Sequence, residues 1–301
     1  MQILIPHAFS HIKLPNGISA TIFDGDVDEL PPNLDEIEIY VPSYMGGDGI
    51  YNAIDKMPRL KWLQLLTAGI DRALPFMREG VTLCNAKGVH DDATAELTIA
   101  LILTRLRGID ATIRAKNQGW STRKTRPSIF GAKVTIIGAG SIGRRIATLI
   151  TAFGGLPTLV SRGGHNDTIA FNVCEEVVRN SDIVVVVVPL TSETKGLIDA
   201  NFLAMMPNNS LLINVARGEV VVTADLYKEV SSGRISAGID VTDPEPLDPS
   251  HPLWECENVV ITPHVGGATK SFYIKATELL EDNLARISRG ETPKNVIEGS
   301  Y

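Results

Sequence analysis

The sequence has few cysteines, no excess of positive charge and no long apolar run. Cys84, Cys174 and Cys256 are an odd number, lie far apart and form no CxxC pair, so neither a disulfide framework nor a zinc site is predicted. The net charge of −7 provides no basic surface for nucleic acid or an anionic membrane. The longest apolar runs, such as 183–190, fall far short of the ~20 residues that span a bilayer.

Targeting and metal-binding signals are also missing. The first residues, Met1–Pro6, lack the basic start and cleavage site of a signal peptide, so we expect a cytoplasmic protein. The histidines form no visible metal cluster, and the acidic stretch 24–29 lacks the glycine and final Glu at the positions of a calcium loop. We interpret that stretch as a solvated turn and expect no metal.

What the chain does contain is enough apolar sequence for two domains, arranged as two series of strand-like and helix-like segments. With 301 residues and 44% hydrophobic side chains, large cores are possible. The run Val184–Val188 is apolar on both faces, which predicts a central strand covered by helices on each side. Strands are predicted in the later series at 133–137, 157–160, 183–188, 210–214, 236–239 and 259–261. The earlier series predicts them at 2–5, 20–23, 37–41, 62–66 and 83–85.

These series predict an α/β protein with a doubly wound, Rossmann-type parallel sheet domain and a smaller, flavodoxin-like α/β substrate domain. The substrate domain is expected at 1–96 and 277–301, and the dinucleotide-binding domain at 97–276. A helix is predicted over Lys270–Arg289 and ends at Gly290, after which the tail at 295–297 could return to the first domain. The smaller domain is therefore expected to be discontinuous.

The segment Ala93–Arg107 is apolar all round and helical in character. Such a helix must be buried, either between the domains or against another subunit. A polar loop that carries Trp120 is predicted to follow it through Pro127.

Residues 138–143, Gly-Ala-Gly-Ser-Ile-Gly, lie between a predicted strand and a predicted helix. In that context Gly138 makes the tight turn, Gly140 lets the backbone approach a pyrophosphate, and Gly143 lets the helix pack closely on the strand. The helix N-terminus supplies N–H groups to the phosphates. The motif therefore predicts a dinucleotide site.

The end of the next predicted strand indicates which dinucleotide the site prefers. An NAD-selective site usually has Asp or Glu there to bind the ribose 2′-OH, but this chain has Ser161-Arg162. A hydroxyl and a guanidinium can hold a 2′-phosphate, so NADP(H) is the preferred cofactor and NAD(H) is possible. His165 is interpreted as an exposed loop residue rather than a phosphate ligand.

Three chemically distinct side chains follow the last strands, at the sheet edge where α/β proteins bind ligands. Arg217 can hold a carboxylate with two N–H bonds, His264 can exchange a proton near neutral pH, and Glu245 can orient the imidazole. Together they fit hydride transfer between a nicotinamide and a 2-oxo acid.

These motifs resemble the D-isomer-specific 2-hydroxyacid dehydrogenase family over nearly the whole chain. Besides the glycine motif, the matching segments are 60–71, 85–90, 188–194, 214–218, 240–246 and 263–267. The resemblance implies that Arg217 binds and polarises the 2-oxo acid, that His264 donates the proton and that Glu245 pairs with His264. It also implies that the backbone amides of Ala68 and Gly69 hold the substrate carboxylate.

The resemblance further implies a nicotinamide lined by Pro189 and Ala216, with its carboxamide bound to Asp240. With the glycine and Ser-Arg positions, the expected cofactor residues are Gly138, Gly140, Ser141, Ile142, Gly143, Ser161, Arg162, Val188, Pro189, Thr194, Ala216, Asp240, His264 and Gly266. Family members bind substrate in a cleft between domains that close around it. The helix at 93–107 and the Trp120 loop resemble the family's dimer interface, so a homodimer is expected.

Several activities compete within this resemblance. Formate dehydrogenases carry Gln where Glu245 stands. Phosphoglycerate dehydrogenase has a different loop at 66–71 and commonly an appended regulatory domain, which we do not expect in this protein. A reductase of glyoxylate, hydroxypyruvate or a similar 2-oxo acid fits better. A protein of another class, a cofactor-sensing co-repressor, stays a distant alternative. His90 is interpreted as a hinge or supporting residue, because His264 already supplies the proton.

Overall fold

The computed structural model describes residues 1–23, 31–47, 49–120, 123–165 and 167–298, and the chain divides into two compact units. Unit 1 comprises Met1–His90 and Thr269–Tyr301, and unit 2 comprises Asp91–Ala268. The domain boundaries predicted at 96/97 and 276/277 are displaced, because they fall inside helices α2 (Asp91–Arg107) and α8 (Lys270–Ser288). A helix packs as one hydrogen-bonded body, so the chain changes units before each helix begins.

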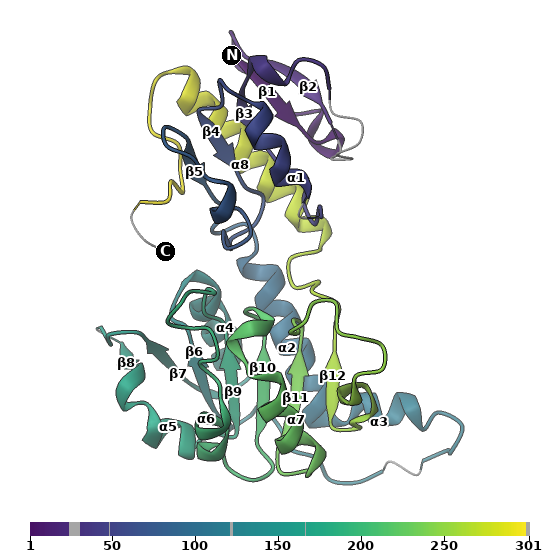
Figure 1. The fold of residues 1–301 in the computed structure, drawn as a ribbon. Helices are drawn as coiled ribbons and strands as arrows, with labels where there is room; N and C mark the ends of the chain where they lie inside the picture. The colour runs from purple at the N-terminus through teal and green to yellow at the C-terminus, as the bar shows by residue number, and fades with distance from the viewer. Residues whose placement is uncertain (24–30, 48, 121–122, 166, 299–301) are drawn as a thin grey trace. The chain divides into compact units, whose positions relative to one another are not determined.

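Unit 2 contains a seven-stranded parallel sheet in the order β12-β11-β10-β9-β6-β7-β8 (Figure 1). The strands are β6 (Lys133–Ile137), β7 (Leu156–Ser161), β8 (Thr168–Ala170), β9 (Ile183–Val186), β10 (Leu211–Asn214), β11 (Ser236–Ile239) and β12 (Val259–Ile261). The six predicted strands are confirmed. β8 was not predicted. The strand order reverses between β6 and β9, which is where doubly wound sheets place their ligands.

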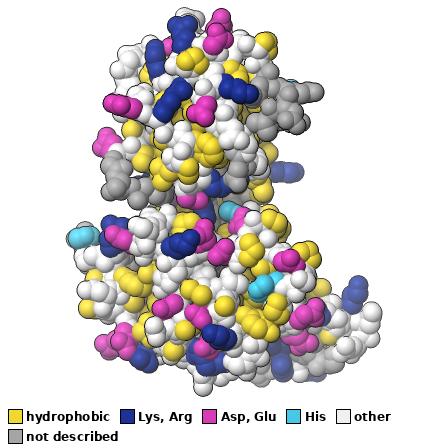
Figure 2. Space-filling view, in the orientation of Figure 1, with side chains coloured by type: hydrophobic (Ala, Val, Ile, Leu, Met, Phe, Trp, Pro, Cys, Tyr) yellow, Lys and Arg dark blue, Asp and Glu magenta, His cyan; other side chains and the backbone are white. Residues whose placement is uncertain are grey.

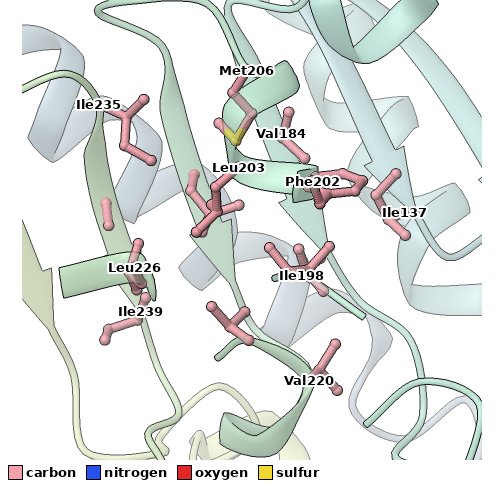
Figure 3. Packing of buried hydrophobic residues seen from close by; sticks show 14 of the residues in the cluster. Ile137, Val184, Ile198, Phe202, Leu203, Met206, Val220, Leu226, Ile235 and Ile239 are labelled. Atoms are coloured by element: carbon pink, nitrogen blue, oxygen red, sulfur yellow. The ribbon is translucent and has the colours of Figure 1, made fainter. Parts of the chain in front are cut away.

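β9 lies at the centre of this sheet, as its apolar sequence predicts. Val184 and Val186 pack on one face of the sheet, in the cluster of Figure 3, while Ile183 and Val185 pack on the other. The first face is covered by α5 (Glu175–Arg179), α6 (Ala200–Met205) and α7 (Thr223–Ser231), and the second by α2 and α4 (Ser141–Ala152). Burial of each side chain of this size stabilises the folded state by ~1.5–3 kcal/mol, so β9 contributes strongly to the stability of unit 2.

Helix α2 buries its apolar side chains within unit 2, where it packs against α4, β10 and β11. The sheet of its own unit therefore covers one face of α2, and burial of the helix between the domains or against another subunit stays a prediction. Gly108, with φ +63°, ends α2, and a second helix, α3 (Ile109–Arg114), replaces the first part of the predicted loop. Asp110 of α3 is buried and accepts hydrogen bonds from Arg105 and Arg114. The homodimer stays a prediction.

Unit 1 contains a five-stranded parallel sheet in the order β2-β1-β3-β4-β5, the flavodoxin-like order. Its strands are β1 (Gln2–Ile5), β2 (Ser19–Ile22), β3 (Ile37–Tyr40), β4 (Trp62–Gln64) and β5 (Thr82–Cys84), which confirms the five predicted strands. Its helices are α1 (Gly49–Asn52) and α8. Gly290, with φ +73°, follows the end of α8, as predicted.

The tail after α8 returns to the sheet of unit 1. The N–H of Ile297 donates to the carbonyl of Leu83 at 2.9 Å, and Val296 forms an antiparallel bridge with Cys84. Unit 1 is therefore discontinuous, as expected. Short 3-10 helices in the two units are His7–Phe9, Leu34–Glu36, Ala53–Lys56, Leu74–Phe76, Phe171–Val173, Gly218–Val220 and Pro252–Glu255.

Acidic and basic side chains of the described residues are interspersed on the face shown in Figure 2. This pattern agrees with the absence of a basic field in the sequence. Within the described part of the chain, none of the helices has both the length and the apolar character needed to span a membrane.

Candidate active site

The glycine turn between β6 and α4 has the shape of a dinucleotide cradle. Gly138 has φ +121°, and a Cβ there would lie 2.5 Å from the carbonyl oxygen of Val187. A Cβ on Gly143 would lie 1.9 Å from the carbonyl oxygen of Gly138, so helix and strand meet backbone to backbone. A Cβ on Gly140 would meet nothing within 4 Å. The outer two glycines therefore serve packing, and Gly140 leaves open space of the kind that a pyrophosphate needs.

Helix α4 begins beside this open space. Gly140 is its N-cap and contributes no side-chain cap, so the first-turn N–H groups, including those of Ser141 and Ile142, point out of the helix toward any anion there. The Ser141 hydroxyl donates to Asp91 at 3.0 Å, and Arg145 donates to Asp92 at 2.6 Å. The first turn of α4 is thus tied to the start of α2, and the backbone of Ser141 is the part suited to a phosphate.

The predicted specificity position lies at the end of β7. The Ser161 hydroxyl is 2.8 Å from the Thr168 hydroxyl and accepts the N–H of Gly164 at 3.2 Å, so it shapes the loop that follows. The guanidinium of Arg162 is 76% exposed and pairs with Glu193 at 2.7 Å. Arg162 therefore presents the positive charge of this loop, while Ser161 holds the loop's conformation.

The loop after β9 closes on itself next to the glycine turn. The Thr194 hydroxyl donates to the carbonyl of Pro189 at 2.6 Å and accepts the N–H of Thr191 at 2.8 Å. Val188 lies 3.2 Å from the position a Cβ on Gly138 would occupy. The predicted cofactor residues Val188, Pro189 and Thr194 thus belong to one loop beside the cradle. His165, in the loop after β7, is exposed, and its backbone N–H donates a hydrogen bond to the Thr168 hydroxyl.

Asn214 builds the turn that carries Arg217. Its side-chain oxygen accepts the N–H of Ala216 at 3.1 Å, and its side-chain nitrogen donates to the carbonyl of Arg217 at 3.1 Å. A Cβ on the next residue, Gly218, would lie 1.8 Å from the carbonyl oxygen of Thr242. Only glycine permits this contact, which brings the loop after β10 against the loop after β11.

Asp240, buried at the end of β11, organises the turn after β12. One of its carboxylate oxygens accepts the Thr262 hydroxyl at 2.5 Å and the N–H of Val265 at 3.0 Å, and the other accepts the N–H of Gly266 at 2.8 Å. Its backbone carbonyl accepts the N–H of His264 at 2.7 Å. These bonds hold His264 at φ +52°, a left-handed conformation that costs ~1–2 kcal/mol. The predicted bond from Asp240 to a carboxamide stays a prediction.

His264 and Glu245 form a pair. The imidazole Nδ1 lies 2.6 Å from a carboxylate oxygen of Glu245, and both side chains are partly exposed, at 42% and 44%. Burial alone raises the pKa of Glu245, but the hydrogen bond from His264 and the charges of His264 and Arg217 outweigh it and lower that pKa below its usual value. Three loops therefore bring His264 into contact with Glu245 and place Arg217 where its charge acts on Glu245.

In unit 1, the loop after β4 has bound carbonyls and open amides. Asn85 donates to the carbonyl of Ala68 at 2.7 Å, the Thr67 hydroxyl donates to that of Gly69 at 2.8 Å, and the N–H of Ala86 donates to that of Thr67 at 2.8 Å. Among the described residues, the N–H groups of Ala68 and Gly69 have no acceptor. Such a pair of N–H groups suits a carboxylate.

The model for the family "D-isomer specific 2-hydroxyacid dehydrogenase, NAD binding domain" matches residues 99–266, more than half of the chain. The chain belongs to this family. The dehydrogenase is 36% identical over 246 residues to a mouse glyoxylate reductase/hydroxypyruvate reductase, a match that covers 77% of this chain and 75% of the mouse protein. It is 32% identical over 261 residues to a glyoxylate reductase of Aeropyrum pernix, covering 81% and 78% of the two chains.

A solved structure extends the similarity to the whole chain. The D-isomer specific 2-hydroxyacid dehydrogenase of Xanthobacter autotrophicus Py2, in complex with NADPH and MES, superimposes with a TM-score of 0.81 at 25% identity and covers 98% of each chain. The protein is therefore an NAD(P)-dependent D-2-hydroxyacid dehydrogenase that uses a nicotinamide cofactor. Within the described residues, no group of three potential metal ligands occurs, and the acidic stretch 24–29 lies outside them.

Sequence reasoning missed the residues that hold this dehydrogenase's site in shape. Asn214 was part of a matching motif, but nothing local shows that its amide spans the Arg217 turn. Thr262 and Thr242 were missed because their partners lie on other strands. Asp91 shows no signal beyond its place at a helix start.

The glycines of the cradle allow a paired test. We expect Gly140→Ala to fold normally, because its φ of −71° suits alanine and its Cβ would meet nothing within 4 Å, but to weaken NADPH binding at least about tenfold. Gly143→Ala should instead lower the thermal midpoint of the cofactor-free protein. Calorimetric titration and thermal melts measure both effects. Unchanged NADPH affinity in Gly140→Ala would contradict the assignment of the cradle.

Proposed function

We propose that this dehydrogenase reduces a small 2-oxo acid of the glyoxylate or hydroxypyruvate type to the 2-hydroxy acid, in the D configuration where the product is chiral. The observation that carries the proposal is the grouping of His264, Glu245 and Arg217. The names of the mouse and Aeropyrum relatives support the substrate class.

Arg217 is assigned to the substrate. A guanidinium binds a 2-oxo acid through its carboxylate and carbonyl oxygens and draws electron density from the carbonyl carbon. The N–H groups of Ala68 and Gly69 are assigned to the substrate carboxylate. Because these donors bind a group that does not react, they set affinity rather than rate.

His264 is assigned as the proton donor to the carbonyl oxygen during reduction. A nicotinamide cofactor, which the glycine cradle and the loop after β9 would hold, would supply the hydride to the carbonyl carbon. The carboxylate of Glu245, which stays ionised because its pKa is lowered, stabilises the charged imidazole through Nδ1. Nε2 is then the nitrogen that delivers the proton.

The proposed reaction is tested by steady-state kinetics with glyoxylate, hydroxypyruvate, pyruvate and branched or aromatic 2-oxo acids, each with NADPH and NADH. We expect the two smallest polar acids to give the highest kcat/KM. His264→Ala should lower kcat at least about 100-fold while NADPH binding is retained, because general acid catalysis contributes ~10²–10⁴-fold. Turnover of no acid in the panel would reject the enzyme assignment and favour a cofactor-sensing protein.

The His264–Glu245 pair predicts a change in pH dependence. The reaction needs a protonated imidazole, so the rate of reduction depends on pH. Glu245→Gln removes the negative charge that supports the imidazolium. We expect the midpoint of the pH–rate profile for reduction to move about one unit lower. A uniform loss of kcat with an unmoved midpoint would mean that Glu245 only orients the ring.

We further propose that NADPH is preferred over NADH, on the basis of Arg162. Its pair with Glu193 is a surface ion pair, worth ~0–1 kcal/mol, so a doubly charged 2′-phosphate can replace the carboxylate. Ser161 contributes by holding the loop, through Thr168 and Gly164. The NADPH in the Xanthobacter structure supports this preference.

Arg162→Ala should raise KM for NADPH about 10–100-fold and leave KM for NADH nearly unchanged, because one charge-assisted contact contributes ~1.5–3 kcal/mol. Ser161→Asp should shift preference toward NADH, because a carboxylate repels the phosphate and binds the 2′-OH. Arg179→Ala is the matched control, since Arg179 is also an exposed arginine with a carboxylate partner, Glu175. Equal KM values for the two cofactors in the native enzyme would show that Arg162 does not make the enzyme prefer NADPH.

A further inference from the structure

His90 lies in a stack of aromatic rings inside unit 1, where the proposed reaction gives it no role. Its side chain is buried, with 6% of the residue exposed. The ring is nearly parallel to those of Tyr44 and Phe272, at centroid distances of 5.5 and 5.3 Å, and those two rings stack on each other at 4.1 Å. Such stacking fixes the plane of the imidazole and therefore the direction of its nitrogens.

The fixed ring makes a specific polar contact with the backbone of Leu66. Nε2 of His90 lies 2.8 Å from the backbone carbonyl oxygen of Leu66. A carbonyl oxygen only accepts, so Nε2 carries the hydrogen in this bond. Leu66 is buried, and its carbonyl stands at the start of the segment 67–69. Without His90, this carbonyl would lose its partner or turn away.

Two carbonyl groups of the loop with the open amides are thus held by one neighbouring segment, 85–90. Asn85 holds the carbonyl of Ala68, and His90 holds that of Leu66. Each peptide plane that carries a held carbonyl also carries the following N–H in a fixed direction, because the peptide unit is planar. Holding the Ala68 carbonyl therefore aims the N–H of Gly69, and holding the Leu66 carbonyl fixes the entry to the loop.

We propose that His90 is a positioning residue for the substrate carboxylate. Through the carbonyl of Leu66, it keeps the N–H groups of Ala68 and Gly69 in the orientation that binds the acid. This inference rests on the proposed function, which assigns those N–H groups to the carboxylate. It gives His90 a role in substrate affinity and none in proton transfer.

Two variants at His90 distinguish the effect of its hydrogen bond to Leu66 from the effect of its stacking on the neighbouring rings. His90→Phe keeps an aromatic ring beside Tyr44 and Phe272 but has no donor for Leu66, and His90→Gln supplies an N–H donor without the ring. We expect His90→Phe to raise KM for glyoxylate about tenfold, with kcat within about twofold of native, because the lost interaction is the same in the ground and transition states. His90→Gln should recover most of the KM, and KM for NADPH should stay unchanged in both.

Phe9→Leu is the matched packing control. Phe9 is buried in the same aromatic group, with its ring 6.2 Å from that of Phe272, and its side chain has no group that could donate a hydrogen bond to the loop after β4. This variant should lower the thermal midpoint and leave KM for glyoxylate unchanged. If Phe9→Leu raises that KM as much as His90→Phe does, general loosening of unit 1 explains both and the proposal is wrong.

A binding measurement distinguishes failure of this proposal from failure of the proposed function. Calorimetry of oxalate with the NADPH-saturated protein reports carboxylate binding without turnover, and we expect His90→Phe to weaken it about tenfold. If the native protein reduces glyoxylate but His90→Phe matches it in both KM and oxalate affinity, the role of His90 is rejected and the reductase assignment stands. If the native protein neither reduces any 2-oxo acid nor binds oxalate, both proposals fail.

Discussion

The carboxylate of Asp240 is the constraint on which the site in unit 2 depends. A buried charge needs hydrogen bonds, and Asp240 obtains them from the hydroxyl of Thr262 and from two N–H groups of the turn after β12. That turn can satisfy Asp240 only if it folds back toward β11. His264 lies in the folded-back part, and the bond of its own N–H to the Asp240 carbonyl holds its left-handed backbone. The position of the proposed proton donor thus follows from the need to satisfy a different side chain.

Close backbone contacts complete the arrangement. Gly218 against Thr242 and Gly143 against Gly138 are approaches that any Cβ would prevent. The first brings the loop of Arg217 to the loop of Glu245, so the guanidinium helps lower the pKa of that carboxyl. The second seats α4 on β6, which leaves the N–H groups of its first turn beside Gly140. At both glycines the lack of a Cβ lets two backbone segments come into contact. The reactive groups belong to the neighbouring residues that this contact brings together.

In unit 1, buried polar side chains hold the strand, the helix and the returning tail in one arrangement. Asn283 of α8 donates to Gln64 at the end of β4 and accepts the N–H of Lys294, which ties the returning tail to the sheet. Gln64 in turn donates to the carbonyls of Leu65 and Asn85, next to the loop with the open amides. Each of these groups would be costly to bury unpaired, by ~1–3 kcal/mol, so the network specifies one arrangement of strand, helix and tail.

The sequence by itself determined the features that depend on neighbouring residues. These are eleven of the twelve strands in the described part of the chain, the flavodoxin-like and doubly wound classes, the glycine turn and the chemical types at Arg217, Glu245 and His264. Periodicity and turn composition are local, so they can be recognised without the fold. Only the tertiary structure decided that α2 is buried on its own sheet, that Ser161 is bound to Thr168 while Arg162 presents the charge, and that His90 binds Leu66. Those outcomes depend on which hydrogen-bond partners and covering surfaces meet across strands, and no local pattern carries that information.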